Sequence, residues 1–178
     1  MHYIHYLREC RRRLEVVDLG MDILGRASGC GSILIADGDA AFQAFAKTLF
    51  SRAGYTTIEA ASGTEALAAI RAAQPALVVL DVSLGDINGF EMCRELRDEF
   101  DEKLPIIFVS AERVEAVDRT VGLLVGGDDY VVKPFDPDEF LARARRAIVR
   151  SRPDEAPLTT PSDFDLTNRE NRSARTTC

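Results

Sequence analysis

Short apolar runs alternate along this chain with longer segments of helical periodicity. Four of the runs are bounded by turn residues and rich in β-branched side chains, which is typical of strands that are buried on both faces. They cover residues 33–36, 77–80, 106–109 and 130–132. A fifth run, 55–59, alternates apolar and polar residues and predicts an edge strand.

Helical spacing fills the gaps between these runs. Segment 40–53 has its apolar residues on one face of a helix, and Asp39 stands where it can cap the first turn. Further helices are predicted over 64–73, 90–100, 113–124 and 138–149. Five strands that alternate with five helices predict an α/β fold, a doubly wound five-stranded parallel sheet with right-handed crossovers.

The two ends of the chain differ from this body. Residues 32–150 form the predicted domain, whereas 1–31 are expected to be a leader, with a helix over 6–19 and a flexible glycine-rich joint over 25–31. That joint precedes a strand instead of following one, so its glycines do not predict a dinucleotide site. Residues 151–178 are rich in Pro, Thr, Ser, Asn and Arg and are expected to be a disordered linker.

Composition and charge narrow the classes of function. The 178 residues are 46% hydrophobic and 29% charged, which fits one globular domain with tails. No stretch is long and apolar enough to predict a membrane span. The formal net charge is −7, with the acidic excess in the body, and this argues against nonspecific binding of nucleic acid by this chain alone.

Two scarce residue types exclude further kinds of site. The only histidines are His2 and His5, so the body holds no Ser-His-Asp or Cys-His centre and no histidine-rich metal site. The four cysteines are scattered and form no CxxC pair. They are therefore interpreted as reduced thiols, which predicts a cytoplasmic location.

Polar residues stand at the predicted carboxyl ends of four strands: Asp37, Asp81, Ser110 and Lys133. In doubly wound sheets ligands bind outside this edge. Two carboxylates there suit a divalent cation with oxygen ligands, and a lysine beside them can meet an added anionic group. Each residue alone has an ordinary explanation as a turn, a cap or a surface residue, and Asp39 keeps that explanation. The hypothesis of a site rests on the four residues occurring together.

Four motifs within residues 32–150 carry a resemblance to a known family. They are Ile33-Leu-Ile-Ala-Asp37, Leu80-Asp-Val-Ser-Leu-Gly-Asp-Ile-Asn-Gly89, Phe108-Val-Ser-Ala111 and Gly127-Asp-Asp-Tyr-Val-Val-Lys-Pro-Phe135. Together they resemble the receiver domain of a two-component response regulator. The resemblance implies a flavodoxin-like strand order, 2-1-3-4-5, and a role in phosphorelay signal transduction.

The resemblance also implies the central chemistry. Asp81 matches the phosphoacceptor, which takes a phosphoryl group from a histidine kinase with the help of Mg²⁺. Asp37 matches one of the acidic pair that holds the metal, and Ser83 matches the position whose backbone carbonyl completes the metal shell. No separate enzyme activity is implied, although a receiver can catalyse its own phosphoryl transfer and dephosphorylation.

Three further residues receive roles in switching. Ser110 matches the hydroxyl that bonds the phosphoryl group, and Lys133 matches the lysine that contacts a phosphoryl oxygen. Tyr130 matches the switch aromatic whose ring moves inward on activation, and the bond from Lys133 to Pro134 is typically cis in the family. The switch repacks the face made by the fourth helix, fifth strand and fifth helix of the domain, which is also a face for a homodimer.

The chain departs from the family pattern at three positions. Gly38 stands where the family has the second acid after strand one, normally a direct metal ligand. An alternative function is therefore open: a non-phosphorylated pseudo-receiver that acts as a protein-interaction module. Gly85 replaces the proline common four residues after the acceptor, and Asn88 replaces an aspartate. Both are expected to be tolerated, since Asn-Gly still makes a turn.

Two weaker resemblances concern other functions. Segment 166–170 resembles the opening of a LuxR-type helix-turn-helix domain, which predicts a truncated effector and a role in transcription regulation. Separately, Asp37 and Asp39 resemble the paired aspartates of haloacid-dehalogenase-like phosphatases, with Asp37 as nucleophile and Asp39 as acid/base. That alternative leaves Asp81 without a role.

Overall fold

The computed structural model describes residues 31–111 and 116–151. Its strands are β1 (Ser32–Ala36), β2 (Thr56–Ala60), β3 (Leu77–Asp81), β4 (Ile106–Ser110) and β5 (Asp129–Val132). Its helices are α2 (Ala40–Arg52), α3 (Gly63–Ala73), α4 (Gly89–Phe100), the short 3-10 helix η2 (Asp101–Lys103), α5 (Ala116–Leu124) and α6 (Pro137–Ser151). The predictions for the leader, the linker and segment 166–170 lie outside the described residues.

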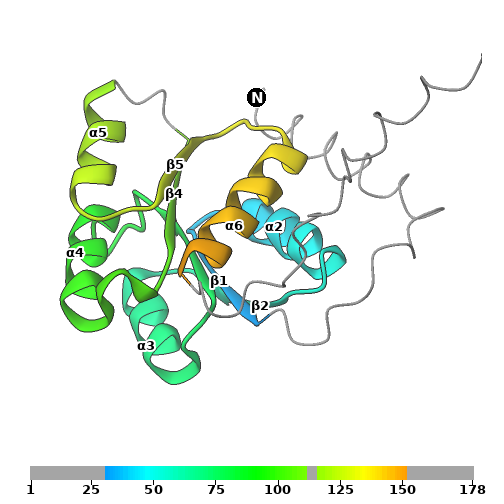
Figure 1. The fold of residues 1–178 in the computed structure, drawn as a ribbon, viewed down its shortest axis with the longest axis horizontal. Coiled ribbons are helices and arrows are strands. Elements are labelled where there is room, and N and C mark those ends of the chain that lie inside the picture. The colour runs from blue at the N-terminus through cyan, green and yellow to red at the C-terminus, as the bar shows by residue number, and fades with distance from the viewer. Residues whose placement is uncertain (1–30, 112–115, 152–178) are drawn as a thin grey trace, which may run out of the picture.

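The strands form one parallel five-stranded sheet in the order β2-β1-β3-β4-β5 (Figure 1). This confirms the predicted fold class and strand order, with β2 at an edge as its alternating pattern indicated. Asp81 and Ser110 are the last residues of their strands instead of the first residues after them. The ladder extends that far because Asp81 still pairs with Val109, and Ser110 with Val132.

Side-chain caps start the three helices that follow β1, β2 and β3. Asp39 accepts a hydrogen bond from the backbone N–H of Ala41 at 2.9 Å, which confirms its interpretation as a helix cap. Ser62 caps α3 and Asn88 caps α4 in the same way. These caps satisfy backbone donors that have no partner within the helix. They also fix where the chain leaves each strand end.

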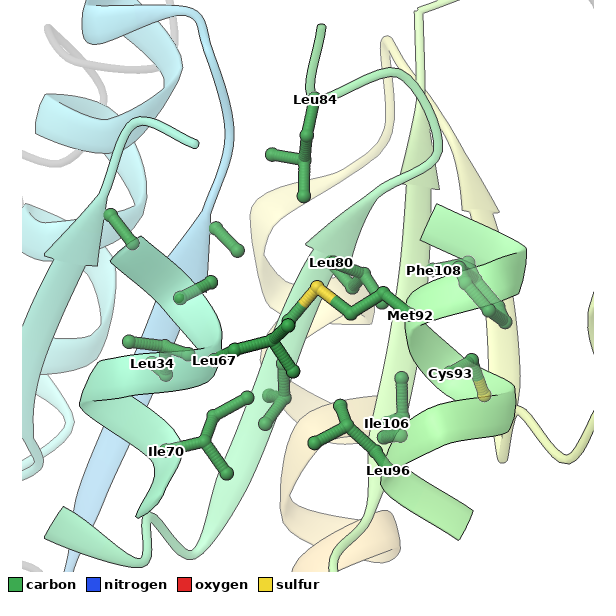
Figure 2. Packing of buried hydrophobic residues seen from close by; sticks show 14 of the residues in the cluster. Leu34, Leu67, Ile70, Leu80, Leu84, Met92, Cys93, Leu96, Ile106 and Phe108 are labelled. Carbon is green, nitrogen blue, oxygen red and sulfur yellow. The ribbon is translucent and has the colours of Figure 1, made fainter. Parts of the chain in front are cut away.

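Helices cover the two faces of the sheet, as Figure 1 shows, and each face has its own apolar cluster. Alternate residues of one strand face opposite sides, so Ile35 belongs to the cluster beneath α2 and α6. Leu34 belongs to the cluster beneath α3 and α4, where it lies with Leu80, Met92 and Phe108 (Figure 2). Among the described helices, none combines the length and the apolar character that crossing a membrane would require.

Candidate functional site

The carboxyl ends of β1, β3, β4 and β5 bring the four expected polar residues to one edge of the sheet. Three of them are buried: Asp37 is 1% exposed, Ser110 5% and Lys133 4%. Asp81 is only partly buried. The four residues thus converge at this edge as the sequence predicted, and the structure adds that the Asp81 carboxylate is partly open to solvent while that of Asp37 is not.

Asp37 and Lys133 form a buried ion pair. The Lys133 Nζ atom lies 2.5 Å from Oδ2 of Asp37. The other oxygen, Oδ1, accepts the backbone N–H of Asp39 at 2.8 Å. Both oxygens of the buried carboxylate thus have protein donors, which offsets the cost of removing two charges from water.

Lys133 is also held by its surroundings. Its Nζ atom lies 3.8 Å from the centre of the Phe42 ring, which attracts the ammonium through the negative face of the π-system. Its backbone N–H donates to the carbonyl of Ser110 at 2.7 Å. The bond from Lys133 to Pro134 is cis, as the resemblance implied. Lys133 is therefore fixed between β4 and the cluster beneath α2 and α6.

Asp81 has a different electrostatic environment. Burial, followed by the negative charge of Asp37, raises the pKa of Asp81 from 3.8 to about 6. Lys133 and hydrogen bonds from the backbone of Ser83 and Val82 act in the opposite direction. An added positive charge beside the two carboxylates would relieve this repulsion.

The donors present fit a hard divalent cation only in part. Asp37, Asp81 and the Ser83 carbonyl offer oxygen, and Mg²⁺ commonly keeps several waters when it binds to one or two carboxylates. The described part of the chain has no group of three or more His, Cys, Asp or Glu side chains suited to a metal. Gly38 stands where the family has a second acid, and a Cβ added there would meet no atom within 4 Å. Position 38 therefore has room for the missing side chain.

The end of the loop after β3 lies close to the backbone of Asp81. A Cβ at Gly89 would lie 2.5 Å from the backbone oxygen of Asp81, so only glycine fits there. Gly85 has φ +87°, a conformation that proline, with φ near −65°, does not reach. The glycine that replaces the family's proline thus gives this loop a different backbone path.

The side of the site beyond β4 is aromatic. Tyr130 is 3% exposed, and its ring centre lies 6.2 Å from that of Phe108. A Cβ at Gly122 would come within 3.1 Å of the Tyr130 ring, and one at Gly127 within 2.6 Å of the Phe108 ring. The ring of Tyr130 therefore lies inside the molecule, in a space that Gly122 leaves open, and Gly127 leaves room for the neighbouring Phe108 ring.

Sequence reasoning missed two polar residues that shape the site. Gln43 on α2 donates from its side-chain amide to the backbone carbonyls of Asp37, at 2.8 Å, and Ala60, at 2.9 Å. It thereby joins the ends of β1 and β2. Asp86, in the loop after β3, hydrogen-bonds to the start of α3. The contact of Gln43 with Ala60 and that of Asp86 with α3 have no signal in sequence spacing, because each links segments that only the fold brings together.

Comparison with known proteins decides the family. The model of the family described as "Response regulator receiver domain" matches residues 33–145. The chain belongs to this family. Response regulators of this kind are the receiving partners of two-component systems, and receiver domains generally bind Mg²⁺ and interact with histidine kinases.

Relatives of this receiver include transcriptional regulators. The chain is 44% identical over 119 residues to "Probable transcriptional regulator ycf27" of Pyropia yezoensis, covering 67% of this chain and 48% of that protein. It is 37% identical over 134 residues to "DNA-binding response regulator MtrA" of Mycobacterium leprae, covering 75% and 58%. The chain thus spans about half the length of the curated relatives it matches.

Solved structures agree with the receiver fold. A putative response regulator from Chloroflexus aurantiacus has a TM-score of 0.63 and 31% identity, covering 67% of this chain and 98% of that one. A CheY-like receiver domain protein from Methanospirillum hungatei has a TM-score of 0.64 and 25% identity, covering 68% and 96%. The likeness therefore covers nearly the whole of these isolated receiver structures.

Proposed function

We propose that this receiver accepts a phosphoryl group on Asp81 from a histidine kinase. In the transfer, the bond from phosphorus to the kinase's histidine nitrogen breaks as a bond to an Asp81 carboxylate oxygen forms. The observation that carries the proposal is the contrast at the sheet edge between a partly exposed Asp81 and the buried Asp37–Lys133 pair. Of the two aspartates Asp37 and Asp81, Asp81 is the one open to an incoming phosphoryl donor.

The other residues of the site have roles in this reaction. Charge on the transferring oxygens must be balanced, and phosphoryl transfer depends on positioning and electrostatics more than on covalent chemistry. Lys133, fixed by Asp37 and Phe42, supplies an ammonium at the edge. Ser110, at the end of β4, supplies a hydroxyl there. No separate substrate is implied, so the activity is the domain's own phosphoryl transfer and dephosphorylation.

Mg²⁺ belongs to the same proposal. Asp37, Asp81 and the Ser83 carbonyl would hold it. When bound, the ion balances charge on the phosphoryl oxygens. The scattered cysteines favour a reducing compartment, so the proposal places the reaction in the cytoplasm.

The output of the proposed switch is the face of α5, β5 and α6. A phosphoryl group adds negative charge and strong acceptor oxygens, which draw the Ser110 hydroxyl towards it. Tyr130 already lies buried beside Phe108, so the change would repack α5 around a ring that is inside. The same face is proposed for a homodimer. Regulation of transcription would follow in a longer protein of the kind its relatives represent.

One observation favours a second function. Gly38 removes a carboxylate from the metal site, so a pseudo-receiver that binds a protein partner without phosphorylation is the alternative. The phosphatase alternative has less support, because the Asp39 carboxylate is engaged as the cap of α2 and Asp37 as the partner of Lys133. Turnover of a phosphate ester that is lost in Asp37→Asn but kept in Asp81→Asn would revive it.

Intact mass after incubation with a small phosphodonor, with and without Mg²⁺, tests the proposal. We expect a gain of one phosphoryl group that depends on Mg²⁺ and is absent in Asp81→Asn. A folded chain that gains nothing at high Mg²⁺, and nothing from its cognate kinase, would establish the pseudo-receiver instead.

A further inference from the structure

The carboxylate of Asp86 is joined to the first turn of a helix far away in sequence. Its Oδ1 accepts the backbone N–H of Gly63 at 2.7 Å, and its Oδ2 accepts the N–H of Thr64 at 3.0 Å and the Thr64 hydroxyl at 2.9 Å. These are charge-assisted bonds at the positive end of α3. Consistently, the hydrogen bonds from Thr64 and Gly63 lower the pKa of Asp86 to about 2.

These bonds hold the far end of the loop formed by residues 82–88. Val82 and Ser83 in this loop donate backbone hydrogen bonds to Asp81. The loop is closed at its base, where Gly89 donates to the carbonyl of Val82 at 2.9 Å and Ser83 pairs with Asn88. Beyond this base, the hydrogen bonds of Asp86 attach the loop to α3. Ile87 adds an apolar contact, because a Cβ at Gly63 would lie 2.8 Å from the Cβ of Ile87.

Leu84 also anchors the loop, but at a different point. It is 5% exposed and lies at the edge of the cluster beneath α3 and α4, as Figure 2 shows. The Leu84 side chain holds the loop against that cluster, whereas Asp86 holds the loop against the start of α3. Between them lies Gly85 with φ +87°, which gives the chain more freedom there than proline would.

We infer that Asp86 is a positioning residue for the acceptor site: it ties the loop to α3 and so holds the Ser83 backbone beside Asp81. The bonds to Gly63 and Thr64 supply the order that a proline at position 85 would otherwise supply. This inference rests on the proposed phosphorylation of Asp81. It concerns how the loop is held, since the Asp86 carboxylate is engaged by the first turn of α3.

Four variants of the full chain test the inference. Asp86→Ala removes all three bonds, Asp86→Asn keeps an acceptor oxygen without the charge, and Thr64→Val removes only the hydroxyl donor. Asp98→Asn is the matched control, because it removes one exposed acidic charge of α4, away from this loop. Thr64→Val keeps the test informative if Asp86→Ala fails to fold.

The first measurement is amide hydrogen exchange of the unmodified protein. We expect Asp86→Ala to lose protection at the Gly63 and Thr64 amides and across residues 82–88, Asp86→Asn to lose part of it, and Asp98→Asn to match the wild type. Unchanged protection at these amides in Asp86→Ala would overturn the inference, since the tie would then not order the loop.

The second measurement is the rate of Asp81 labelling by a small phosphodonor at saturating Mg²⁺. We expect a loss of roughly tenfold in Asp86→Ala, with partial rescue in Asp86→Asn, because several bonds to a charged group are lost. A folded Asp86→Ala protein that labels at the wild-type rate would overturn the inference while leaving the proposed function standing. A wild type that never labels would instead overturn the proposed function, and the exchange data would still report the tie.

Discussion

The ends of β1 and β3 each carry an aspartate, and the two are in opposite situations. Asp37 is 1% exposed, and its oxygens are taken by Lys133 and the backbone of Asp39. Asp81 is partly exposed, and burial together with the charge of Asp37 raises its pKa to about 6. Each oxygen of Asp37 has a donor within the protein, whereas burial and the charge of Asp37 outweigh the favourable contacts of Asp81.

This difference shows that two aspartates at one sheet edge can have different roles. A paired, buried charge is costly to disturb and therefore gives a rigid base for the lysine. A carboxylate whose charge is disfavoured gains most from a cation or from conversion to a neutral or esterified form. The environment of each aspartate, and not its residue type, decides which one anchors and which one reacts.

The largest effect is expected from breaking the anchor. Asp37→Asn leaves the Lys133 ammonium buried without its counter-charge, and loss of one partner of a buried pair costs about 3–5 kcal/mol. Chemical denaturation monitored by circular dichroism should show a loss of this size. In the control, the double variant Asp37→Asn with Lys133→Met should recover much of the stability. A single variant as stable as wild type would show that Asp37 does not anchor the lysine.

The next expected effect is a gain in folding stability, and it tests the acceptor Asp81. The folded pKa of Asp81 lies above its ordinary value of 3.8, so ionisation of this group destabilises the fold. The cost is absent well below pH 4, where the acid is protonated in both states, and is complete above about pH 6. In metal-free buffer at pH 8, Asp81→Asn should stabilise the protein by about 1–2 kcal/mol.

The pH profile of that variant separates this cause from others. The gain of Asp81→Asn over wild type should fall to a small fraction of its pH 8 value when the denaturation is repeated at pH 4. A gain that persists there would come from packing or backbone effects, and a loss of stability at pH 8 would mean that Asp81 is a structural residue.

Gly38→Asp should reduce the difference between the ends of β1 and β3, because it adds the second acid that the family has after its first strand. Position 38 has no atom within 4 Å of an added Cβ, so the new side chain does not require repacking. A third carboxylate should tighten Mg²⁺ binding roughly tenfold and speed labelling of Asp81, since ligand charge sets affinity for hard cations. Calorimetric titration and intact mass measure both. Gly38→Asn has the same size without the charge, and an equal effect of the two variants would exclude this explanation.

Much of this picture could be predicted from the sequence because the fold is read from local patterns. Buried parallel strands are continuous apolar runs, and strand ends lie at one edge, so Asp37, Asp81, Ser110 and Lys133 could be brought together without coordinates. The Asp39 cap is also local, two residues from its donor. The contact of Asp86 with Gly63 spans 23 residues and depends on the loop path that Gly85 permits. No periodic pattern encodes such a contact.

The unequal environments of Asp37 and Asp81 were likewise beyond sequence reasoning. Both aspartates follow apolar strands, and their motifs treat both simply as acids of one site. Asp37 pairs with Lys133, whose ammonium lies over the Phe42 ring, whereas Asp81 is only partly buried. Burial of a side chain is a property of the assembled layers, so it appears only when the helices are in place.

The smallest effect should come from an ion pair at the surface, which shows how much burial contributes to the Asp37–Lys133 pair. Arg143 lies 2.7 Å from Asp129 and 2.6 Å from Glu139, and the side chain of Arg143 is 34% exposed. Water and salt screen such pairs, so Arg143→Gln should cost only about 0.5 kcal/mol. Adding about 1 M salt should remove that cost, since the screening length falls to about 3 Å. The cost of Asp37→Asn should survive the same salt, because solvent ions do not reach the buried pair. Equal salt sensitivity of the two variants would mean that Asp37 and Lys133 are accessible to water in solution, and the assignment of Asp37 as the anchor would fall.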